Sequence, residues 1–426
     1  MSKLINKKQE IKNRKDLINK GEVPEGYKKS STKVFPKDWN EEKLENLCIK
    51  RTKTVRNRVL ETLSISAGIG FVNQAQKFGR ELSGKQYEHY IIINKGDFAY
   101  NKGNSKKYPQ GCVYLLEDRE VAAVPNVFNT FKLKANCING YYKQLFQIGY
   151  LNQQLHKYIN LGVRNDGLLN LYDSDFYSVL LPYPKLKEQE KIAEILSCCD
   201  KVIELKESLI EKTRIQNNYI LECLYDSFRT NTKYSLQEIA AFRRGSFPQP
   251  YNLPEWYDED NGKPFVQVFD IDDNYMLKKT TKTKISNLAI PKSVFVPKGS
   301  LIISIQGSIG RVAITQYDSY VDRTILIFIK FKKDIDKMFL LYALKKLFDY
   351  EKEIAPGQTI KTITKEVLSN FKIVLPSMEE QRNFAKIINQ INSKINLLEQ
   401  ELEQYKQLKK SLSQLLLTGI VRVNEV

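Results

Sequence analysis

The stretch FAKIINQINSKINLLEQELEQYKQLKKSLSQLLLTG, residues 384–419, decides the fold, because its apolar side chains recur at alternating steps of four and three residues. This spacing is typical of a helix that packs along a second helix. Only Lys409 interrupts the stripe, whose members are Phe384, Ile388, Ile391, Ile395, Leu398, Leu402, Tyr405, Lys409, Leu412 and Leu416. A partner helix is therefore expected elsewhere in the chain.

A second copy of this region begins 192 residues earlier. The segment PSMEEQRNFAKIINQ aligns with PKLKEQEKIAEILSC, and a proline, a Glu-Gln pair and an alanine coincide. Proline is tolerated in the first turn of a helix but not in its interior, so each segment predicts the beginning of a helix. The coinciding positions are Pro184 and Pro376, Glu188 and Glu380, Gln189 and Gln381, and Ala193 and Ala385.

The first copy carries a similar apolar stripe, although Lys206, Thr213 and Asn217 weaken its middle. We predict that the two helices pack on each other as a coiled coil; the alternative is that each stripe packs on its own globular domain. Cys199 and Ile220 also fall on the first stripe. The predicted seam consists of Ile192, Leu196, Ile203, Ile210 and Leu224 in the first helix and Ile388, Ile391, Ile395, Leu398, Leu402 and Leu412 in the second.

A strand-rich region precedes each helix. Alternating and β-branched residues predict strands in YIIINKGDFAYNKG, GCVYLLE and NTFKLK of the first region, and in PFVQVFDI, SVFVPKGSLIISIQGSIGRVAI and TILIFIKFK of the second. Outside such landmarks the two regions hardly match, which indicates different surfaces. We predict an α+β fold with a pseudo-two-fold internal repeat: a basic N-terminal extension at 1–35, globular regions at 36–183 and 231–375, long helices at 184–230 and 376–420, and a tail at 421–426.

The charge indicates a polyanionic partner. The formal net charge is +18 and the isoelectric point about 9.3, values that most often accompany nucleic-acid binding. A surface of solvated lysines without a specific partner is the alternative. The excess is uneven, because residues 1–58 hold 17 Lys/Arg against 8 Asp/Glu.

Other functional classes find little support. No apolar run reaches the length of a membrane span, and the charged start MSKLINKKQEIKNRK does not look like a secretory signal, so we expect a cytoplasmic protein. Six scattered cysteines and two histidines give no zinc spacing. GRELSGKQ at 79–86 resembles a phosphate-binding loop, but Gln86 replaces the Ser/Thr that would hold magnesium. We expect no catalytic residue, metal site or cofactor in this chain.

Basic and amide side chains gather in loops of both regions. Lysine and arginine neutralise phosphates, arginine also pairs with guanine, and asparagine and glutamine pair with adenine edges. Each loop alone is explained as an exposed polar segment, but together, on two domains, the loops indicate DNA binding. The candidates in the first region are Lys50, Arg51, Lys53, Arg56, Arg58, Asn101, Lys102, Asn104, Lys106, Lys107 and Arg164. Those in the second are Arg243, Arg244, Lys278, Lys279, Lys282, Gln306, Ser308, Arg311, Gln358, Thr359 and Lys361.

The chain resembles the specificity subunits of type I restriction-modification systems over about residues 20–420. FPKDWNEEKLENL (35–47) resembles the beginning of the first target-recognition domain in that family, and residues 63–111 resemble one recurrent type of such a domain almost throughout. VFVPKGSLIISIQGSIGRVAI (294–314) resembles the matching core of the second domain. The Leu-Pro followed by Glu-Gln before both long helices is the most recognisable landmark.

The resemblance implies two target-recognition domains and an antiparallel coiled coil that sets the spacer of a bipartite, asymmetric DNA site. It also implies two modification subunits, which bind S-adenosylmethionine and methylate adenine, and restriction subunits with ATP-driven translocase and nuclease activity that need Mg²⁺. The basic N-terminal extension is a departure whose role stays open. A DNA-binding architectural protein and a stand-alone nuclease are the alternatives, and a neighbouring methyltransferase gene would separate them from the specificity subunit.

Overall fold

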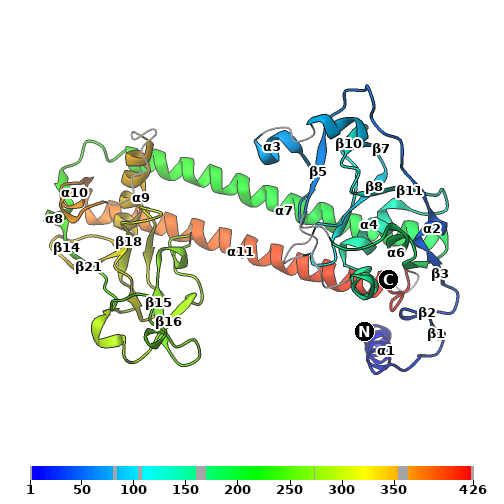
Figure 1. The fold of residues 1–426 in the computed structure, drawn as a ribbon. Helices are drawn as coiled ribbons and strands as arrows, with labels where there is room; N and C mark the ends of the chain where they lie inside the picture. The colour runs from blue at the N-terminus through cyan, green and yellow to red at the C-terminus, as the bar shows by residue number, and fades with distance from the viewer. Residues whose placement is uncertain are drawn as a thin grey trace. The chain divides into compact units, whose positions relative to one another are not determined.

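The computed structural model describes residues 2–79, 84–103, 108–159, 169–272, 274–353 and 363–423. They form two compact units, of which the first comprises Met1–Glu207 and Glu401–Val426 and the second Ser208–Gln400. Helices α7 (Leu186–Asp226) and α11 (Met378–Leu417) each contribute residues to both units (Figure 1). The boundaries between units thus cross the long helices, whereas the sequence analysis divided the chain at the ends of these helices.

The first unit is built on a four-stranded antiparallel sheet with the order β4-β11-β8-β9. Phe98 and Phe131 stack in its core, with their ring centroids 5.4 Å apart. Helices α4 and α6 cover this core. The strands of this unit are β1 (Tyr27–Lys29), β2 (Val34–Pro36), β3 (Asn40–Lys43), β4 (Cys48–Lys50), β5 (Leu63–Ser66), β6 (Gly70–Asn73), β7 (Ile91–Asn94), β8 (Asp97–Asn101), β9 (Cys112–Leu115), β10 (Val121–Val124), β11 (Asn129–Leu133) and β12 (Leu180–Tyr183). Its shorter helices are α1 (Ser2–Asn19), α2 (Leu44–Leu47), α3 (Gln74–Phe78), η1 (Gly84–His89), α4 (Asn139–Gln147), α5 (Asn152–Tyr158) and α6 (Asp173–Tyr177).

The second unit repeats this plan, with a sheet in the order β14-β21-β18-β19. Its apolar inner strands and the buried face of α9 form the core. Its strands are β13 (Lys233–Ser235), β14 (Ala240–Arg244), β15 (Lys263–Val266), β16 (Thr283–Ile285), β17 (Val294–Val296), β18 (Leu301–Ser304), β19 (Val312–Ile314), β20 (Ser319–Val321), β21 (Ile325–Phe331) and β22 (Lys372–Val374). Its shorter helices are α8 (Leu236–Ile239), η2 (Pro254–Trp256), η3 (Val268–Asp270), η4 (Ile290–Lys292), α9 (Lys337–Glu353) and α10 (Lys365–Ser369).

The two units differ at their peripheral sheets. In the first, β7 pairs with β10 and β5 forms a hairpin with β6. In the second, a four-stranded sheet has the order β16-β15-β20-β17 and contains one parallel pair, β15 with β20. A common sheet therefore carries different additions in the two units, which agrees with the weak sequence match outside the landmarks.

The coinciding Glu-Gln pairs have a structural reason. In the first unit, the Gln189 side chain donates to the carbonyl of Pro184 (2.9 Å) and accepts the amide of Ile138 (2.9 Å). Gln381 does the same in the second unit, where it donates to Pro376 (2.9 Å) and accepts the amide of Asp336 (2.9 Å). Each buried glutamine thus joins the start of a long helix to the helix that covers the sheet.

The long helices pair in antiparallel fashion inside each unit. In the first unit, Asp200 pairs with Lys409 and Lys206 with Glu401 (2.8 Å), so numbers rise along α7 as they fall along α11. Lys409, the break in the stripe, is therefore part of this pairing. In the second unit, Arg214 pairs with Glu399, and Leu221 packs in one cluster with Phe384 and Ile388. The antiparallel pairing implied by the family resemblance is therefore present.

Both expectations for the stripe are partly right. Ile210, Ile388 and Ile395 are buried, but near the helix ends the stripe packs on the globular cores, as at Ile192 and Leu196. The remaining predicted seam residues, Ile203, Leu224, Ile391, Leu398, Leu402 and Leu412, are half-buried. Two stripe positions are wrong: Tyr405 is 41% exposed and Ile220 38% exposed, whereas the next residue, Leu221, is 3% exposed. The helix therefore turns Leu221 inward where a strict heptad would select Ile220.

Replacing Asn217 with leucine is expected to raise the free energy of unfolding of the second unit by about 1–2 kcal/mol. Its buried Nδ2 has no hydrogen-bond partner among the described residues, and such a group loses its hydration without compensation. Urea unfolding measures the change in free energy, and hydrogen exchange in residues 208–226 shows where the added protection lies. Asn218→Leu is the control, because Asn218 is exposed. An equal gain in both variants would contradict the explanation.

The N-terminal extension packs against the end of the chain, within the first unit (Figure 1). Arg14 of α1 donates to the carbonyl of Ile420 (2.6 Å), and the Tyr27 hydroxyl donates to that of Gly419 (2.8 Å). Gly419 has a φ of +70°, and a Cβ there would lie 2.6 Å from Pro36.

No helix in the described parts of the chain is long and apolar enough to cross a membrane.

Candidate DNA interface

In the second unit, two of the predicted basic loops meet at one edge of the common sheet. β14 ends at Arg244, and the amide of the next residue, Gly245, donates to Ile325 at the start of β21 (2.9 Å). Ser304, the last residue of β18, pairs with the same Ile325. Gln306 and Ser308 follow β18 directly and precede β19. We call this row of strand ends the strand-end edge.

The first unit has an equivalent strand-end edge. β4 ends at Lys50, and the amide of Arg51 donates to Thr130 near the start of β11 (2.8 Å). β8 ends at Asn101, which pairs with Cys112 at the start of β9. The loops KRTKTVRNR and YNKGNSKKYPQG, far apart in the sequence, therefore leave the sheet on the same side.

In each unit the chain also returns to the edge at a later point, at Leu169 and Ile363. The amide of Leu169 donates to the carbonyl of Lys102, and that of Ile363 to the carbonyl of Ile305, both at 3.0 Å. These two contacts hold equivalent positions just after β8 and β18. Several predicted DNA contacts lie outside the described residues: Asn104, Lys106, Lys107, Arg164, Gln358, Thr359 and Lys361.

Arg51 has a structural partner that the sequence prediction did not foresee. Its guanidinium makes two hydrogen bonds of 2.9 Å to the carboxylate of Asp97, whose side chain is fully buried. The amide of Asn94 donates to the same carboxylate (2.8 Å). Arg51 is therefore engaged in an ion pair inside the domain, and its DNA contact stays a prediction.

Arg243 is the equivalent residue of the second unit, and among the residues that the structure describes it has no carboxylate partner. Ser300 stands where the first unit has Asp97, directly after the Lys-Gly turn before the inner strand. The Arg243 side chain is exposed, and its Nε donates weakly to the carbonyl of Arg244 (3.4 Å). Matching arginines thus hold a fold together in one unit and face solvent in the other.

Three further candidates are partly engaged. Lys102 pairs with Asp173 (2.6 Å) and its side chain is 16% exposed. Arg311 donates to the carbonyl of Ile271 (2.8 Å), and Asn101 accepts the amide of Gly103 (2.8 Å). These contacts shape the strand-end edges, and DNA contact at these residues stays a prediction.

The other described candidates lie at the surface. Lys278 and Lys282 border a loop built around buried Asp270, which accepts the amides of Lys282 (3.0 Å) and Gln267 (2.8 Å). Gln306 is half-buried. The exposed candidates are Lys50, Lys53, Arg56, Arg58, Arg243, Arg244, Lys278, Lys279, Lys282 and Ser308. A positive surface of this kind attracts phosphates, but the structure does not test which side chain meets DNA.

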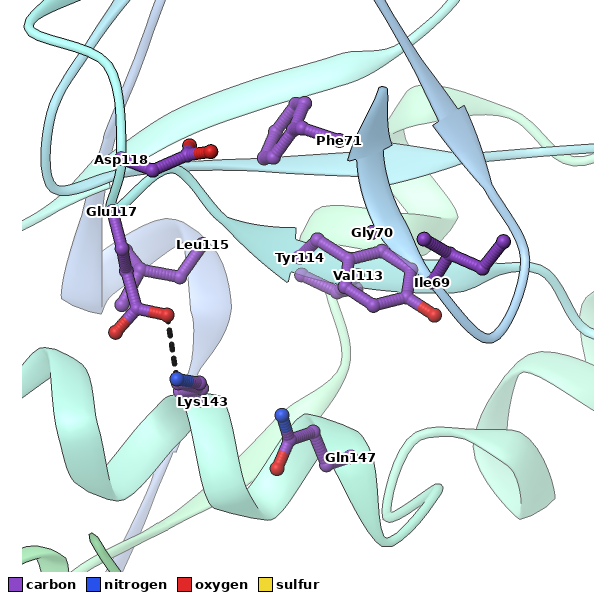
Figure 2. A pocket seen from close by; sticks show the side chains of 10 residues that line it. All are labelled: Ile69, Gly70, Phe71, Val113, Tyr114, Leu115, Glu117, Asp118, Lys143 and Gln147. Carbon is purple, nitrogen blue, oxygen red and sulfur yellow. Dashed lines mark hydrogen bonds and ion pairs between the residues drawn. The ribbon is translucent and has the colours of Figure 1, made fainter. Parts of the chain in front are cut away.

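A pocket of about 290 Å³ lies beside β9 in the first unit (Figure 2). The Tyr114 hydroxyl accepts the amide of Gly68 (2.8 Å) and so holds the β5–β6 hairpin, while burial raises the pKa of Tyr114 to about 12. Lys143 and Glu117 form an ion pair of 2.5 Å on the opposite wall. The charged lining residues are Glu117, Asp118 and Lys143, and Lys143 is already paired with Glu117, so we assign the pocket to hairpin support.

Cys48, Cys112 and Cys137 are not activated thiols. Burial raises the pKa of Cys48 to about 12 and those of Cys112 and Cys137 to about 11, so these thiols stay protonated near neutral pH. Among the described residues, no cluster of three potential metal ligands is found.

The sequence analysis missed one position at each strand-end edge. Asn126 and Arg323 occupy the turns that lead into β11 and β21, and both side chains are exposed. Each turn is only a few residues long and carries no run of basic residues, so composition gave no signal. Only the alignment of the two strand pairs places these residues at equivalent sites.

Comparison with known protein families supports this geometry. The family described as "Type I restriction modification DNA specificity domain" matches residues 36–213 and again residues 230–407. The chain belongs to this family. The two matches begin at the two globular regions, so this specificity protein contains two such domains in tandem.

Individual relatives extend over most of the chain. A "Putative type I restriction enzyme MjaX specificity subunit" from Methanocaldococcus jannaschii is 24% identical, with 94% of this chain and 97% of the relative covered. The "Type I restriction enzyme MjaVIII specificity subunit" of the same organism is 25% identical, with 62% and 67% covered.

Solved structures share the fold. A chain from the structure described as "Structural basis underlying complex assembly and conformational transition of the type I R-M system" has a TM-score of 0.59 and 17% identity, covering 91% of this chain and 99% of the other. The "Type-I restriction-modification system S subunit from M. genitalium" has a TM-score of 0.52 and 16% identity, with 89% and 96% covered.

Proposed function

We propose that this chain is the DNA-specificity subunit of a type I restriction-modification complex. The observation that carries the proposal is the pair of equivalent strand-end edges, one in each domain of this family, on which exposed cations and amides gather. Each domain reads one half of a bipartite site. Because the peripheral sheets differ, the two half-sites differ in sequence, and the helix pair sets the spacer between them.

Recognition proceeds in two physical stages. Exposed lysines and arginines first attract DNA through its phosphates, with an affinity that falls steeply as the salt concentration rises. Side chains of each strand-end edge then pair with base edges, most effectively in the major groove, where all four base pairs can be distinguished. This chain contributes recognition alone and performs no catalytic step.

The chemistry belongs to partner subunits in this proposal. Two modification subunits bind S-adenosylmethionine and methylate adenine at the selected site, and restriction subunits use ATP and Mg²⁺ to move along and cut unmodified DNA. The complex works in the cytoplasm, where its DNA is found. The cofactors are thus bound outside this chain.

Modified-base sequencing tests the proposal. DNA is compared from cells that express this chain with its neighbouring methyltransferase, and from cells that express the methyltransferase alone. We expect a bipartite adenine-methylated motif that depends on this chain. In a second arm, residues 36–183 are exchanged for the corresponding domain of another family member, which should change one half-site and leave the other and the spacer intact. Methylation that is identical with and without the chain would refute the proposal.

A further inference from the structure

We infer that Asn126 and Arg323 are specificity-determining residues that contact base edges, one in each half-site. The inference rests on the proposed function and assigns a reading role to two side chains. The geometry points to them because they occupy the same turn of the repeated fold at the strand-end edge.

The two turns are built alike. Each joins the last strand of the peripheral sheet, β10 or β20, to the second strand of the common sheet, β11 or β21. In the first unit the amide of Phe128 donates to the carbonyl of Pro125 (3.1 Å). In the second, the amide of Ile325 donates to the carbonyl of Asp322 (3.0 Å). Asn126 and Arg323 each follow the accepting residue and therefore hold matching positions.

The second turn lies directly against the basic end of β14. A Cβ added to Gly245 would stand 2.4 Å from the carbonyl oxygens of both Val321 and Asp322, so the two backbones touch. Gly245 follows Arg243 and Arg244, which are exposed. Arg323 thus adds a third guanidinium to one small area, and in the described part of the chain no acidic side chain pairs with it. Three arginines close together at the surface, with the neighbouring Asp322 carboxylate buried and bonded to Thr324, favour a polyanionic partner.

The first turn has a similar neighbourhood. Val124, just before the turn, pairs with Ile91, and Ile91 also pairs with Thr54 in the basic segment KRTKTVRNR. This ladder brings the exposed Lys53 close to the turn. Phosphate-binding and base-reading side chains can therefore act together there, as they do at DNA interfaces generally.

The backbone on which each of the two side chains is mounted is held in place by neighbouring residues. The Asp322 carboxylate accepts the Thr324 hydroxyl (2.5 Å) and is 4% exposed, so the residue before Arg323 is fixed inward. Pro125 restricts the backbone before Asn126, and Phe128 after it is buried. An exposed side chain in a short turn whose flanking residues are held can meet a base with little loss of freedom.

The side chains also have the chemistry of base readers. Arginine pairs in bidentate fashion with O6 and N7 of guanine, and asparagine with N6 and N7 of adenine. Equivalent positions with different readers would give the two domains different sequence preferences. We therefore assign a guanine to Arg323 in the half-site of the second domain, and an adenine to Asn126 in the half-site of the first.

The test begins with the motif that modified-base sequencing defines for the wild-type complex. Duplexes with this motif and with every single-base change are then titrated with complexes of the methyltransferase and wild-type, Arg323→Ala or Asn126→Ala chain. Arg323→Ala is expected to weaken binding about tenfold to a hundredfold and to abolish discrimination at one guanine only. Asn126→Ala should do the same at one adenine of the other half-site.

Lys330→Ala and Lys132→Ala are matched controls, because these exposed lysines lie farther along β21 and β11. They should leave every preference unchanged. The inference is overturned if Arg323→Ala binds all duplexes as Lys330→Ala does. It is also overturned if Arg323→Ala weakens all duplexes equally and reduces the salt dependence, which indicates a phosphate contact. Failure of the proposed function is distinct, since the wild-type complex would then show no motif at all.

Discussion

Replacing Arg51 with alanine is expected to lower the free energy of unfolding of the first unit by about 3 kcal/mol, the low end for removal of one partner from a buried ion pair. The Asp97 carboxylate would remain fully buried and lose both of its 2.9 Å hydrogen bonds from the guanidinium. The carboxylate would keep the hydrogen bond from the amide of Asn94, which does not neutralise a charge. The low end applies because the Arg51 side chain is 29% exposed, so water can partly enter the site.

Arg243→Ala is the matched control for this experiment. The two arginines hold equivalent positions, but Ser300 replaces the buried carboxylate in the second unit. In the control, we expect the free energy of unfolding in urea to change by less than about 0.5 kcal/mol, as for surface substitutions generally. Hydrogen exchange in β4, β8 and β11 locates the loss in Arg51→Ala. Equal effects of the two substitutions would mean that the Asp97 pair contributes nothing to stability.

Replacing Arg422 with alanine is expected to release the C-terminal tail and to destabilise the first unit by about 3 kcal/mol. Arg422 donates to the carboxylate of Glu188 at 2.7 and 2.8 Å and to that of Asp38 at 2.9 and 2.8 Å. Trp39 donates its indole N–H to Glu188 as well (2.9 Å), and Glu188 is 8% exposed. Without Arg422, the buried Glu188 carboxylate would keep the hydrogen bond from the Trp39 indole but lose its charged partner.

The Arg422 variant is compared with Lys410→Ala, which removes an exposed charge from α11 in the same unit. Thermal unfolding measures the loss, and hydrogen exchange in residues 415–423 reports the released tail. A variant that unfolds like Lys410→Ala, with a protected tail, would show that apolar packing alone holds the chain end.

The same ion pair gives a pH dependence. The hydrogen bond from Arg422 holds the pKa of the Asp38 carboxyl below its usual value. A depressed pKa contributes stability above the unfolded value, about 3.9, and this contribution is lost as the pH falls through the folded pKa. The wild type should therefore lose stability below about pH 4 more steeply than Arg422→Ala does.

Much of the architecture was predictable from the sequence, because the residues that define the repeat make contacts with residues close to them in the chain. Gln189 and Gln381 each bond to a proline five residues earlier, and the apolar stripe follows the geometry of a single helix. Tyr405 and Ile220 were misplaced, since a strict heptad ignores the small rotation by which Leu221 enters the core.

The candidate site was less predictable, because its residues meet only through long-range pairing. Arg51 and Asp97 are 46 positions apart, and nothing in either segment announces the ion pair. Arg323 was missed for the opposite reason: it stands alone in a short turn, and only the pairing of β14 with β21 places it beside Arg243 and Arg244. Runs of basic residues in the sequence therefore indicated the strand-end edge. Isolated candidate residues such as Arg323 could be placed there only from the register of the paired strands.

The order in which the two units can fold during synthesis follows from the way the first unit is assembled. Its core contains Leu416, Leu417 and Val421 beside Phe35 and Trp39, whereas the second unit is one continuous segment, Ser208–Gln400. During synthesis, the second unit can complete its segment before residues 401–423 of the first unit have emerged. A chain cut short before residue 401 would lack these core residues, so the first unit would be left unfinished, with apolar surface open to proteases.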